Sequence, residues 1–597
     1  MAKRPKKKKT GAGDISRRDF AGGSFATTEA AWSGRDWQLC LVLLAAVFVA
    51  YLPVWRAGYL WDDDLMLTRN PCIIGPLGLK EMWTTSEADI CPLTLTTLWF
   101  EHKLWGLAPL PYHLVNVLLH GLSAVVLWRV LRSLAVPGAW LGAALWALHP
   151  VQVESVAWIT EMKNTQSGLF FLLSILFFLK WLSMDRVARK SWNGNYALTL
   201  AFAAMAIASK SSTVLLPVVL CLCAWRQEGR WKWRNVTALV PIFAMSLVAG
   251  AVSVWTQGLQ TMVANDPLQA RTWPDRLVMA GASVWFYLGK LMWPHPLVTI
   301  YPPLQFDAGR LVSYLPLLAA AGTLFVLWWN RKTWARHWFF AFAYFLVMLL
   351  PVLGLADNFI FRYSLVFDHF QYLASMGPLA LIGAVIVRIT DRFAPNRAWP
   401  RVVFGGTILV ILGGLTWNRA LVYKSEETLW ADTLEHNPTA WIAHSNLGQI
   451  YTQEGRIDEA IGQDRMALQF HSSSPETHYN LGAALFQKGQ IDEAMAEYRK
   501  AIELYPTFPE AHYALGKALA KAGRMSDAIV EFRMAVKFNP GQSSVHNDLG
   551  AALFQSGELD EALVEFQEAL RIDPTNAAAQ SNVAKTNAKL AKRMPPK

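Results

Sequence analysis

From residue 39 to residue 422 the chain consists of apolar runs separated by short polar loops that carry Lys and Arg. A helix needs about 17–25 mainly apolar residues to cross a bilayer, and many such runs in series predict an all-α, multi-pass membrane bundle. The runs 196–209 and 212–226 are short for two separate crossings. The expected crossings are 39–55, 112–132, 139–158, 165–183, 196–209, 212–226, 236–256, 277–293, 311–329, 338–356, 368–389 and 402–422.

Lys and Arg near the ends of the runs predict the orientation, because cytoplasmic loops are enriched in these residues. The N-terminal segment Lys3–Lys9 and the loops that follow Arg129 and Arg226 are therefore expected on the cytoplasmic side. The loop 56–111 is then expected on the outer face. Assignments from the two ends disagree in parity within 236–310, which predicts one run there that is re-entrant or lies along the surface. About 11 crossings follow, with the C-terminal part outside.

After residue 424 the pattern changes to a repeat of 34 residues. Period 34 with small residues and Pro at fixed positions is the signature of tetratricopeptide repeats, in which Gly and Ala let the two helices of a repeat cross closely. We expect a joining half-repeat at 424–438, four repeats forming an α-solenoid at 439–574, and a capping helix and tail at 575–597. The recurring positions are Gly448, Gly482, Gly516 and Gly550; Gly455, Gly489, Gly523 and Gly557; Ala460, Ala494, Ala528 and Ala562; and Pro506, Pro540 and Pro574.

One polar position also recurs, as His444, His478, His512 and His546. Such a ladder is compatible with a metal site or a pH sensor. We favour a packing position copied by duplication, because neutral His serves well on half-buried helix faces. From the fold alone, the array is expected to bind an extended polypeptide on its concave face.

Composition and charge follow the same division. Of the 597 residues, 53% are hydrophobic and 17% charged, whereas soluble chains carry about 25% charged residues. Of the 28 Trp residues, 26 precede residue 424. The basic cytosolic tail 1–37 holds nine Lys and Arg against four Asp and Glu, the membrane domain 38–423 holds 29 against 17, and the remainder holds 17 against 23. The net charge of +11 is therefore explained by membrane topology and by a tail that can sit on anionic lipid, and no nucleic-acid partner is predicted.

Polar side chains in or beside the apolar runs are candidates for function, because ionisable groups are expensive in a bilayer. The first outer loop contains Asp62, Asp63 and Asp64 in sequence. These carboxylates repel one another, which favours a raised pKa in at least one and predicts a general base or a cation site; a solvated helix cap is the alternative.

A second group of candidates is expected at the outer ends of the helices. His113, Asn116 and His120 are spaced to share one helical face and are predicted to line a cavity. Lys210 lies among Ser residues, a pattern suited to binding phosphate. Helix packing would explain any one of these residues, so the prediction depends on their convergence near the outer leaflet. The other substrate-binding candidates are His149, Glu154, Lys163, Tyr301, Asp368 and His369.

A cavity at the outer leaflet with carboxylates and lysines suits a polyprenyl-phosphate sugar, whose lipid stays in the bilayer. A general base would deprotonate an acceptor hydroxyl, and cations would stabilise the leaving phosphate. No metal and no cofactor are expected beyond this donor substrate.

Several motifs stand in a fixed order along the chain: Trp61-Asp62-Asp63, Asn70-Pro71, the segment 112–120, His149-Pro150, the segment 154–158 and the repeats. Together they resemble the transmembrane and tetratricopeptide-repeat O-mannosyltransferases and their bacterial relatives, from about residue 39 to 590. The resemblance implies a GT-C fold, an inverting and metal-independent glycosyltransferase, a polyprenyl-phosphate monosaccharide donor, and a Ser or Thr acceptor on a protein. It assigns the catalytic role to Asp62 and Asp63.

The chain departs from the family pattern at three places. Cys91-Pro92 stands where relatives often have Arg-Pro, Glu161-Met162-Lys163 where they often have Glu-Arg-Lys, and Asp368-His369-Phe370 where they have Asp-Arg-Tyr. These departures leave the identity of the sugar open. Cys72 and Cys91 share the outer loop, so a disulfide between them is a further hypothesis for an oxidising compartment.

Two other functions remain open at this point. One is a non-catalytic membrane scaffold whose repeats organise an envelope complex, although a scaffold has no need of polar residues within the membrane. The other is a ligase or transporter for lipid-linked glycans, although a transporter is expected to show inverted internal symmetry. The resemblance to bacterial relatives favours a bacterial inner membrane, with the N-terminus cytoplasmic and the repeats periplasmic.

Overall fold

A computed structural model describes residues 32–593, apart from 76, 86–90, 185–192, 265–270, 305, 357–358 and 396. The basic segment Lys3–Lys9 lies outside the described residues. Over the part that is described, the chain is helical and contains no strand. It divides into two compact units, residues 1–426 and residues 427–597.

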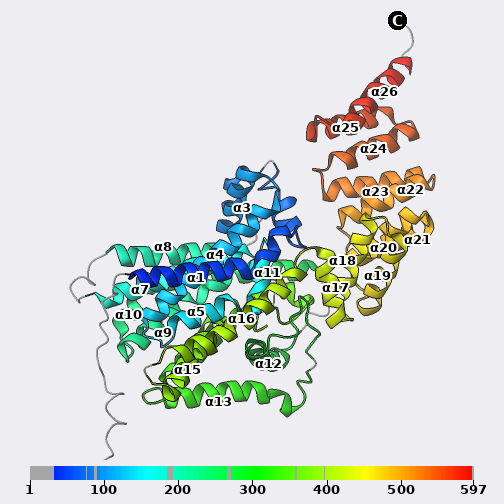
Figure 1. The fold of residues 1–597 in the computed structure, drawn as a ribbon. Coiled ribbons are helices and arrows are strands. Elements are labelled where there is room, and N and C mark those ends of the chain that lie inside the picture. Colours follow the sequence, from blue (N-terminus) through cyan, green and yellow to red (C-terminus); the bar gives the residue numbers. More distant parts are fainter. Residues whose placement is uncertain are drawn as a thin grey trace, which may run out of the picture. The chain divides into compact units, whose positions relative to one another are not determined.

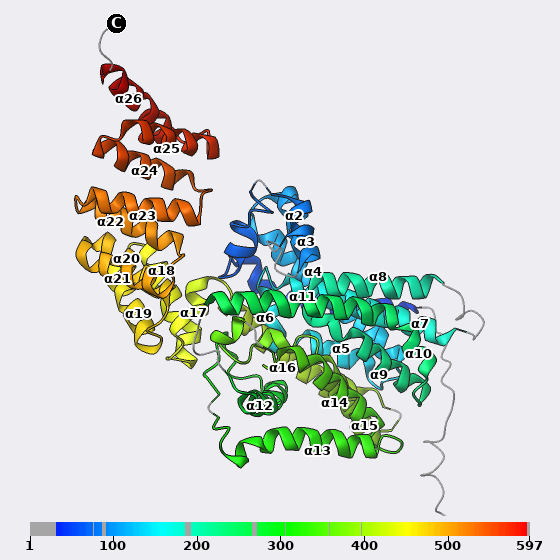
Figure 2. The same cartoon turned by 180° about the vertical axis from the view of Figure 1, so that it is seen from behind.

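The first unit is a bundle of long helices joined by short ones (Figure 1). Helices α7 and α8 pack side by side, and α11 lies along α8 (Figure 2). Its first half contains α1 Gly34–Ala50, α2 Leu79–Thr84, α3 Pro92–Trp105, α4 Pro109–Ser133, α5 Ala139–Ala147, α6 Val153–Ala157, α7 Met162–Ser183, α8 Gly194–Ser209 and α9 Leu216–Glu228. Its second half contains α10 Trp233–Ala238, α11 Val240–Ala264, α12 Trp273–Met292, α13 Leu315–Trp329, α14 Arg336–Leu349, α15 Met376–Phe393 and α16 Trp399–Val422.

Within the described residues, four helical segments are long and apolar enough to cross a membrane: Pro109–Ser133, Met162–Ser183, Leu311–Trp329 and Trp399–Val422. Shorter apolar helices occupy Gly194–Ser209, Val240–Thr256 and Arg336–Val352. The membrane character of the bundle is thus supported, while the count of about 11 crossings stays a prediction.

Several of the expected crossings are not continuous helices, and two of the breaks lie at candidate site residues. The run 139–158 breaks after Ala147, because His149 precedes Pro150, and a residue before proline is driven out of the helical region. The chain continues as the turn η4 Pro150–Gln152 and the short helix α6. The run 368–389 begins as a separate turn, η10 Asp368–Gln371, and the long helix starts only at Met376. Both breaks place polar side chains at helix ends, where backbone groups are available for hydrogen bonds.

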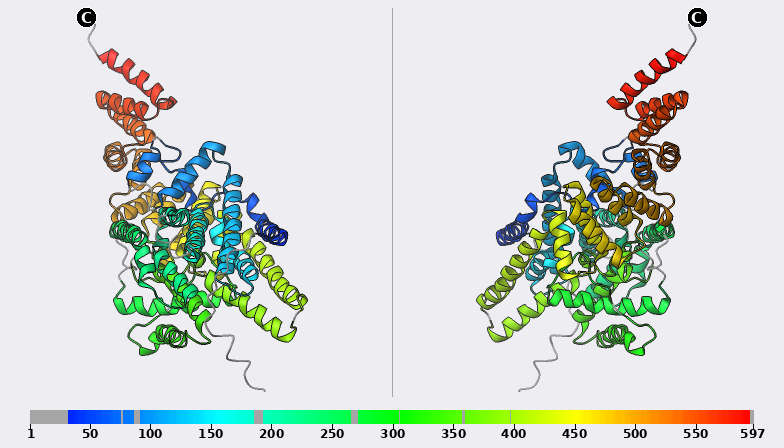
Figure 3. Two further views of the ribbon diagram at one scale, coloured as in Figure 1. Left: turned by 90° about the vertical axis from the view of Figure 1, so that its left-hand side faces the viewer. Right: turned by 90° about the vertical axis from the view of Figure 1, so that its right-hand side faces the viewer.

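The second unit stacks pairs of helices one after another (Figures 1 and 3). Gly482, Gly516 and Gly550 are required at the crossings, because a Cβ atom there would come within 2.6 to 2.8 Å of the rings of Tyr498, Phe532 and Phe566. The helices are α17 Glu426–His436, α18 Trp441–Gln453, α19 Ile457–Phe470, α20 Pro475–Lys488, α21 Ile491–Leu504, α22 Pro509–Lys521, α23 Met525–Phe538, α24 Ser543–Ser556, α25 Leu559–Ile572 and α26 Ala577–Arg593.

The histidine ladder joins each first helix to the second helix of its own repeat. The ring of His512 lies between the Glu531 carboxylate, 2.7 Å from Nδ1, and the Pro506 carbonyl, 3.0 Å from Nε2. Both partners only accept hydrogen bonds, so the doubly protonated imidazolium satisfies them best. His478 and His546 repeat this arrangement with Glu497 and Glu565, whereas His444 faces the Gln463 side chain. The ladder therefore has a packing role, but its partners favour the charged ring at three of the four positions and not the neutral ring expected from the sequence.

We expect the repeats to lose stability as the pH rises above neutral. The hydrogen bond with Glu565 raises the pKa of His546, and Glu531 raises that of His512 against the opposing effect of burial. A raised pKa in the folded state stabilises the fold fully below pH 6.5, and the contribution disappears as the pH passes the folded pKa. NMR titration of the histidines should show His546 above 6.5, and Glu565→Gln should lower its pKa; an unchanged pKa in this variant would contradict the argument.

Candidate active site

The three consecutive carboxylates of the first loop occupy three different environments. Asp63 is fully buried, and its two oxygens accept hydrogen bonds from the backbone N–H groups of Leu60 at 2.8 Å and Thr160 at 2.9 Å. Burial raises the pKa of Asp63 to about 7, and the charge of Asp62 adds to this. Asp64 forms a surface ion pair with Arg69 at 3.1 Å. Asp62 remains partly exposed.

The loop that carries these residues is held in a strained conformation. Trp61 has a φ of 30°, a region that bulky residues rarely adopt. Its backbone N–H donates to the Glu426 carboxylate, and its ring packs against Trp158 and Tyr363 with centroids 5.9 and 5.2 Å apart. Such strain persists only where several contacts fix the residue. These contacts, together with Asp63, fix the position of Asp62.

A second cluster surrounds Glu161, which immediately precedes α7. Its carboxylate lies 2.9 Å from Lys163 Nζ and 4.0 Å from Lys210 Nζ. Asn164 donates a hydrogen bond to Glu161 and accepts one from Lys210. Burial alone would raise the pKa of Glu161, but the positive charges of His369, Lys163 and Lys210 lower it to about 2. The side chains of Lys163 and Lys210 remain 20% and 17% exposed, so this cluster presents two cations to a ligand.

Asp63 connects the loop to this cluster, because Thr160 adjoins Glu161 in the chain. The structure therefore brings Asp62, Lys163 and Lys210 to one region of the first unit. Sequence reasoning identified all three of these residues. It missed the roles of Glu161, Asn164 and Glu426, although the charged pattern of Glu161 and Lys163 was visible.

Four further candidates form a neighbouring buried cluster. Glu154 accepts hydrogen bonds from both the ring Nδ1 and the backbone N–H of His369, at 3.1 and 3.0 Å. The hydroxyl of Tyr301 donates to the Asp368 carboxylate, 3.1 and 3.2 Å from its two oxygens. Lys290 Nζ lies 5.1 Å from the centre of the Tyr301 ring. These contacts join α6, the turn η10 and the segment after α12.

His113, Asn116 and His120 share one face of α4, as their spacing predicts, but they do not line an open cavity. All three are fully buried. Asn116 holds the loop before α7, since its amide donates to two carbonyls of that loop. The polar contacts of the three residues are Gly58 O at 3.3 Å for His113; Trp158 O at 3.0 Å, Ile159 O at 3.1 Å and Thr165 Oγ1 at 2.7 Å for Asn116; and Tyr372 Oη and Ala147 O, both at 2.9 Å, for His120.

His149 likewise connects two segments by hydrogen bonds. Its Nε2 lies 3.1 Å from the Leu291 carbonyl at the end of α12, and its Nδ1 accepts from the Val151 backbone N–H at 3.4 Å. The physical reason is that a helix broken by proline leaves backbone groups that need partners. His113, Asn116, His120 and His149 thus join separate segments in this structure, and their binding of a substrate stays a prediction.

The cysteines of the outer loop are both buried in one apolar cluster. Cys72 and Cys91 lie there among Met66, Leu95 and Met162. No disulfide joins them in this structure, where both are thiols. Among the described residues, no three His, Cys, Asp or Glu side chains converge as a metal site would require.

The fold and these clusters define a helical membrane-type protein that carries a tetratricopeptide-repeat array. The TPR repeat family matches residues 448–489, 483–523 and 550–590. Among solved structures, the array is similar to the TPR protein YrrB, at 26% identity over 28% of this chain and 84% of that chain with a TM-score of 0.26. It is also similar to MamA, at 24% identity over 28% and 89% with a TM-score of 0.23.

Three curated relatives match about seven tenths of the chain. Protein O-mannosyl-transferase Tmtc3 of Drosophila melanogaster is 23% identical over 72% of this chain and 55% of its own length. Tmtc1 of the same organism is 25% identical over 71% and 60%, and F38B6.6 of Caenorhabditis elegans is 21% identical over 70% and 61%. These homologues match the family that the sequence motifs indicate, the transmembrane and tetratricopeptide-repeat O-mannosyltransferases. The match spans little more than half the length of these relatives.

Proposed function

We propose that the protein is an inverting, GT-C type membrane glycosyltransferase that transfers a monosaccharide from a polyprenyl-phosphate donor to a Ser or Thr hydroxyl of a protein. The observation that carries this proposal is the placement of a partly exposed carboxylate, Asp62, by the same segment that holds the cations Lys163 and Lys210. Glycosyl transfer from a sugar phosphate requires a base that takes the proton of the acceptor hydroxyl and cations that stabilise the leaving phosphate. Here one carboxylate and two cations lie near one another.

In the proposed reaction, Asp62 takes the proton from the acceptor hydroxyl as its oxygen attacks the anomeric carbon. The bond between that carbon and the phosphate oxygen breaks, and its electron pair leaves with the polyprenyl phosphate. Lys163 and Lys210 stabilise the charge that develops on this phosphate. A single displacement inverts the anomeric configuration.

The other residues have supporting roles in this proposal. Glu161 holds the two lysines, and Asp63 holds the loop that carries Asp62. The pairs of Glu154 with His369 and of Asp368 with Tyr301 fix η10 against α6 and orient the sugar side of the site. No metal enters the reaction.

The repeat unit is proposed to recruit acceptor polypeptides, a role supported by the TPR family match. The proposal places the N-terminus in the cytoplasm and the repeats in the periplasm of a bacterial inner membrane, with about 11 crossings. Membrane lipid then surrounds the bundle, and the donor's polyprenyl chain lies in the same bilayer.

The direct test is transfer by the purified full chain in nanodiscs. Polyprenyl-phosphate mannose and other polyprenyl-phosphate sugars would be offered with a Ser- and Thr-containing peptide, and glycopeptide would be measured by mass spectrometry. Transfer from at least one donor with inversion at the anomeric carbon supports the proposal. Peptide binding without transfer from any donor would favour the scaffold instead, and transfer to a lipid-linked glycan would favour the ligase.

Removing either lysine of the Glu161 cluster should reduce the stabilisation of the transition state more than the stability of the fold. Lys163→Ala and Lys210→Ala each remove one cation facing the leaving phosphate, and we expect kcat/KM for the donor to fall by about 10²–10³-fold. Steady-state transfer kinetics would measure this. Lys80→Ala is the control, because it removes one lysine that is exposed in the outer loop 56–111, away from the Glu161 cluster. Equal kinetics in all three variants would rule out the phosphate role.

A further inference from the structure

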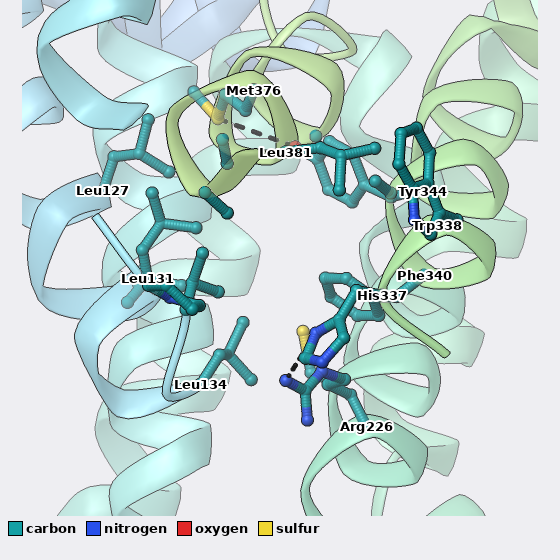
Figure 4. A pocket seen from close by; sticks show the side chains of 18 of the residues that line it. Leu127, Leu131, Leu134, Arg226, His337, Trp338, Phe340, Tyr344, Met376 and Leu381 are labelled. Carbon is teal, nitrogen blue, oxygen red and sulfur yellow. Dashed lines mark hydrogen bonds between the residues drawn. The ribbon is translucent and has the colours of Figure 1, made fainter. Parts of the chain in front are cut away.

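A cavity lies between α4, α7, α9, α14 and α15 (Figure 4). It encloses an empty space of about 1130 Å³, including the solvent at its mouth. Most of its wall is apolar: Leu127, Leu131 and Leu134 face it from α4, and Phe340, Tyr344 and Leu381 from α14 and α15. An empty cavity with such walls favours an apolar occupant, because water gains few hydrogen bonds there.

The cavity lies toward the opposite ends of these helices from the candidate active site. Helix α4 carries Asn116 near its start and ends beside Leu134, which is about 27 Å further along a helix at 1.5 Å per residue. Helix α7 likewise begins just after Glu161 and reaches the cavity wall in its middle, at Leu172 and Ile175. The cavity therefore extends from the middle of the bundle, and because the hydrocarbon core of a bilayer is about 30 Å thick, its end at Leu134 and Arg388 belongs to the leaflet opposite the active site.

The mouth of the cavity is cationic. Arg226 and Arg388 line it, and Arg336 stands next to Arg226, whose backbone carbonyl it binds at 2.7 Å. The Arg226 guanidinium donates a hydrogen bond to His337 Nδ1 at 3.0 Å (Figure 4). Because this nitrogen accepts, the imidazole is neutral, and its ring forms part of the cavity wall. The buried Nε of Arg336 has no hydrogen-bond partner.

These cations have no counter-charge within the described part of the chain, where no carboxylate forms an ion pair with Arg226, Arg336 or Arg388. Arg226 and Arg336 are half-buried, where a guanidinium group without an anion is costly, and Arg388 adds an exposed cation beside them. Guanidinium groups bind phosphate with paired hydrogen bonds. A free phosphate would neutralise the mouth but would leave the apolar walls empty.

We propose that this cavity binds an anionic phospholipid of the leaflet opposite the active site. Its phosphate lies against Arg226, Arg336 and Arg388, and one acyl chain fills the space between α4 and the α14–α15 pair. The site is separate from the proposed donor site and does not depend on the chemistry there. It would couple the packing of five helices to the lipid composition of the membrane.

Native mass spectrometry of the detergent-purified full chain tests this directly, with dioleoyl phosphatidylglycerol and dioleoyl phosphatidylcholine added separately. We expect one phosphatidylglycerol to bind at least about 10-fold more tightly than phosphatidylcholine, which corresponds to about 1.4 kcal/mol. The double variant Arg336→Ala/Arg388→Ala should lose this preference. Arg226 is left intact because it joins α9 to α14.

The matched control is Lys332→Ala/Arg392→Ala, which removes the same charge from exposed positions at the same helix ends, outside the cavity wall. It should bind as the unchanged protein does. A second arm, Ala384→Phe, fills the cavity without changing charge and should also abolish binding. The proposal would be overturned if the protein bound the two lipids equally, or if the control lost the preference for phosphatidylglycerol as the double variant does. It would also be overturned if Ala384→Phe still bound phosphatidylglycerol, or if inorganic phosphate alone displaced the lipid.

Discussion

Replacing Asp62 by Asn is expected to lower kcat for sugar transfer by about 10²–10⁴-fold, the contribution typical of a positioned general base. The side chain is partly exposed, whereas its neighbour Asp63 is fully buried with both oxygens occupied by backbone N–H groups. Asp62 is therefore the better placed of these two carboxylates to meet an acceptor hydroxyl. Because Asn keeps the size of the side chain, KM for the donor and the unfolding temperature should stay close to their original values.

Asp63→Asn provides the contrasting variant. An amide presents an NH2 group to one of the two N–H donors, so the hydrogen bond with Leu60 or with Thr160 is lost. We expect this variant to lose both thermal stability and transfer, since a buried donor left without a partner costs about 1–3 kcal/mol. Full activity in Asp62→Asn would refute the assigned base, whatever happens in Asp63→Asn.

Replacing Asp464 by Leu is expected to stabilise the repeat unit by about 1–3 kcal/mol, the usual penalty of an unsatisfied buried polar group. Asp464 occupies the register position at which the next three repeats have Tyr498, Phe532 and Phe566. It is fully buried, and neither of its carboxyl oxygens has a hydrogen-bond partner. An apolar side chain would join the core that these rings form.

The effect of Asp464 should depend on pH. Burial raises its pKa well above the usual value, so the folded state keeps the proton that the unfolded chain releases. The original protein then loses stability as the pH rises from about 4 toward the folded pKa, and Asp464→Leu should remove this loss. Thermal unfolding monitored by circular dichroism between acid and neutral pH would measure it.

Glu503→Leu is a suitable control, because Glu503 is exposed on the following repeat and should change stability by no more than about 0.5 kcal/mol. A destabilised Asp464→Leu would show that the carboxyl has a partner or a packing role that an apolar group cannot supply. Asp464→Phe, which restores the ring of the other repeats, would then test whether the volume at Gly448 is the limiting factor.

Helices and repeats were predictable because their signals are local. The step of 34 residues gave the four pairs α18–α25 and the capping helix α26, and the apolar runs predicted most helices of the first unit within a few residues. Errors fell at His149-Pro150 and at 368–375, where a continuous apolar run hides a break. Hydrophobic periodicity does not register such breaks, since both sides of the break remain buried.

For the candidate site, too, the sequence showed some features and hid others. The sequence singled out Asp62, Lys163, Lys210 and Glu154 because charged residues beside apolar runs are costly and therefore conspicuous. It could not separate the residues that face a ligand from those that hold the fold. Asn116, His120 and His149 have the same sequence signal, yet their polar atoms are engaged with backbone and side chains of other segments.

The sequence by itself determined the helical class, the division into an apolar unit and a repeat unit, and the set of polar residues that a membrane bundle has to accommodate. Only the tertiary structure decided their roles. Asp63 meets Thr160 across 97 residues and Glu154 meets His369 across 215. The physical reason is that helix formation and repeat packing depend on neighbours a few residues away. The burial, hydrogen bonding and pKa of a carboxylate depend instead on whichever distant segment packs against it.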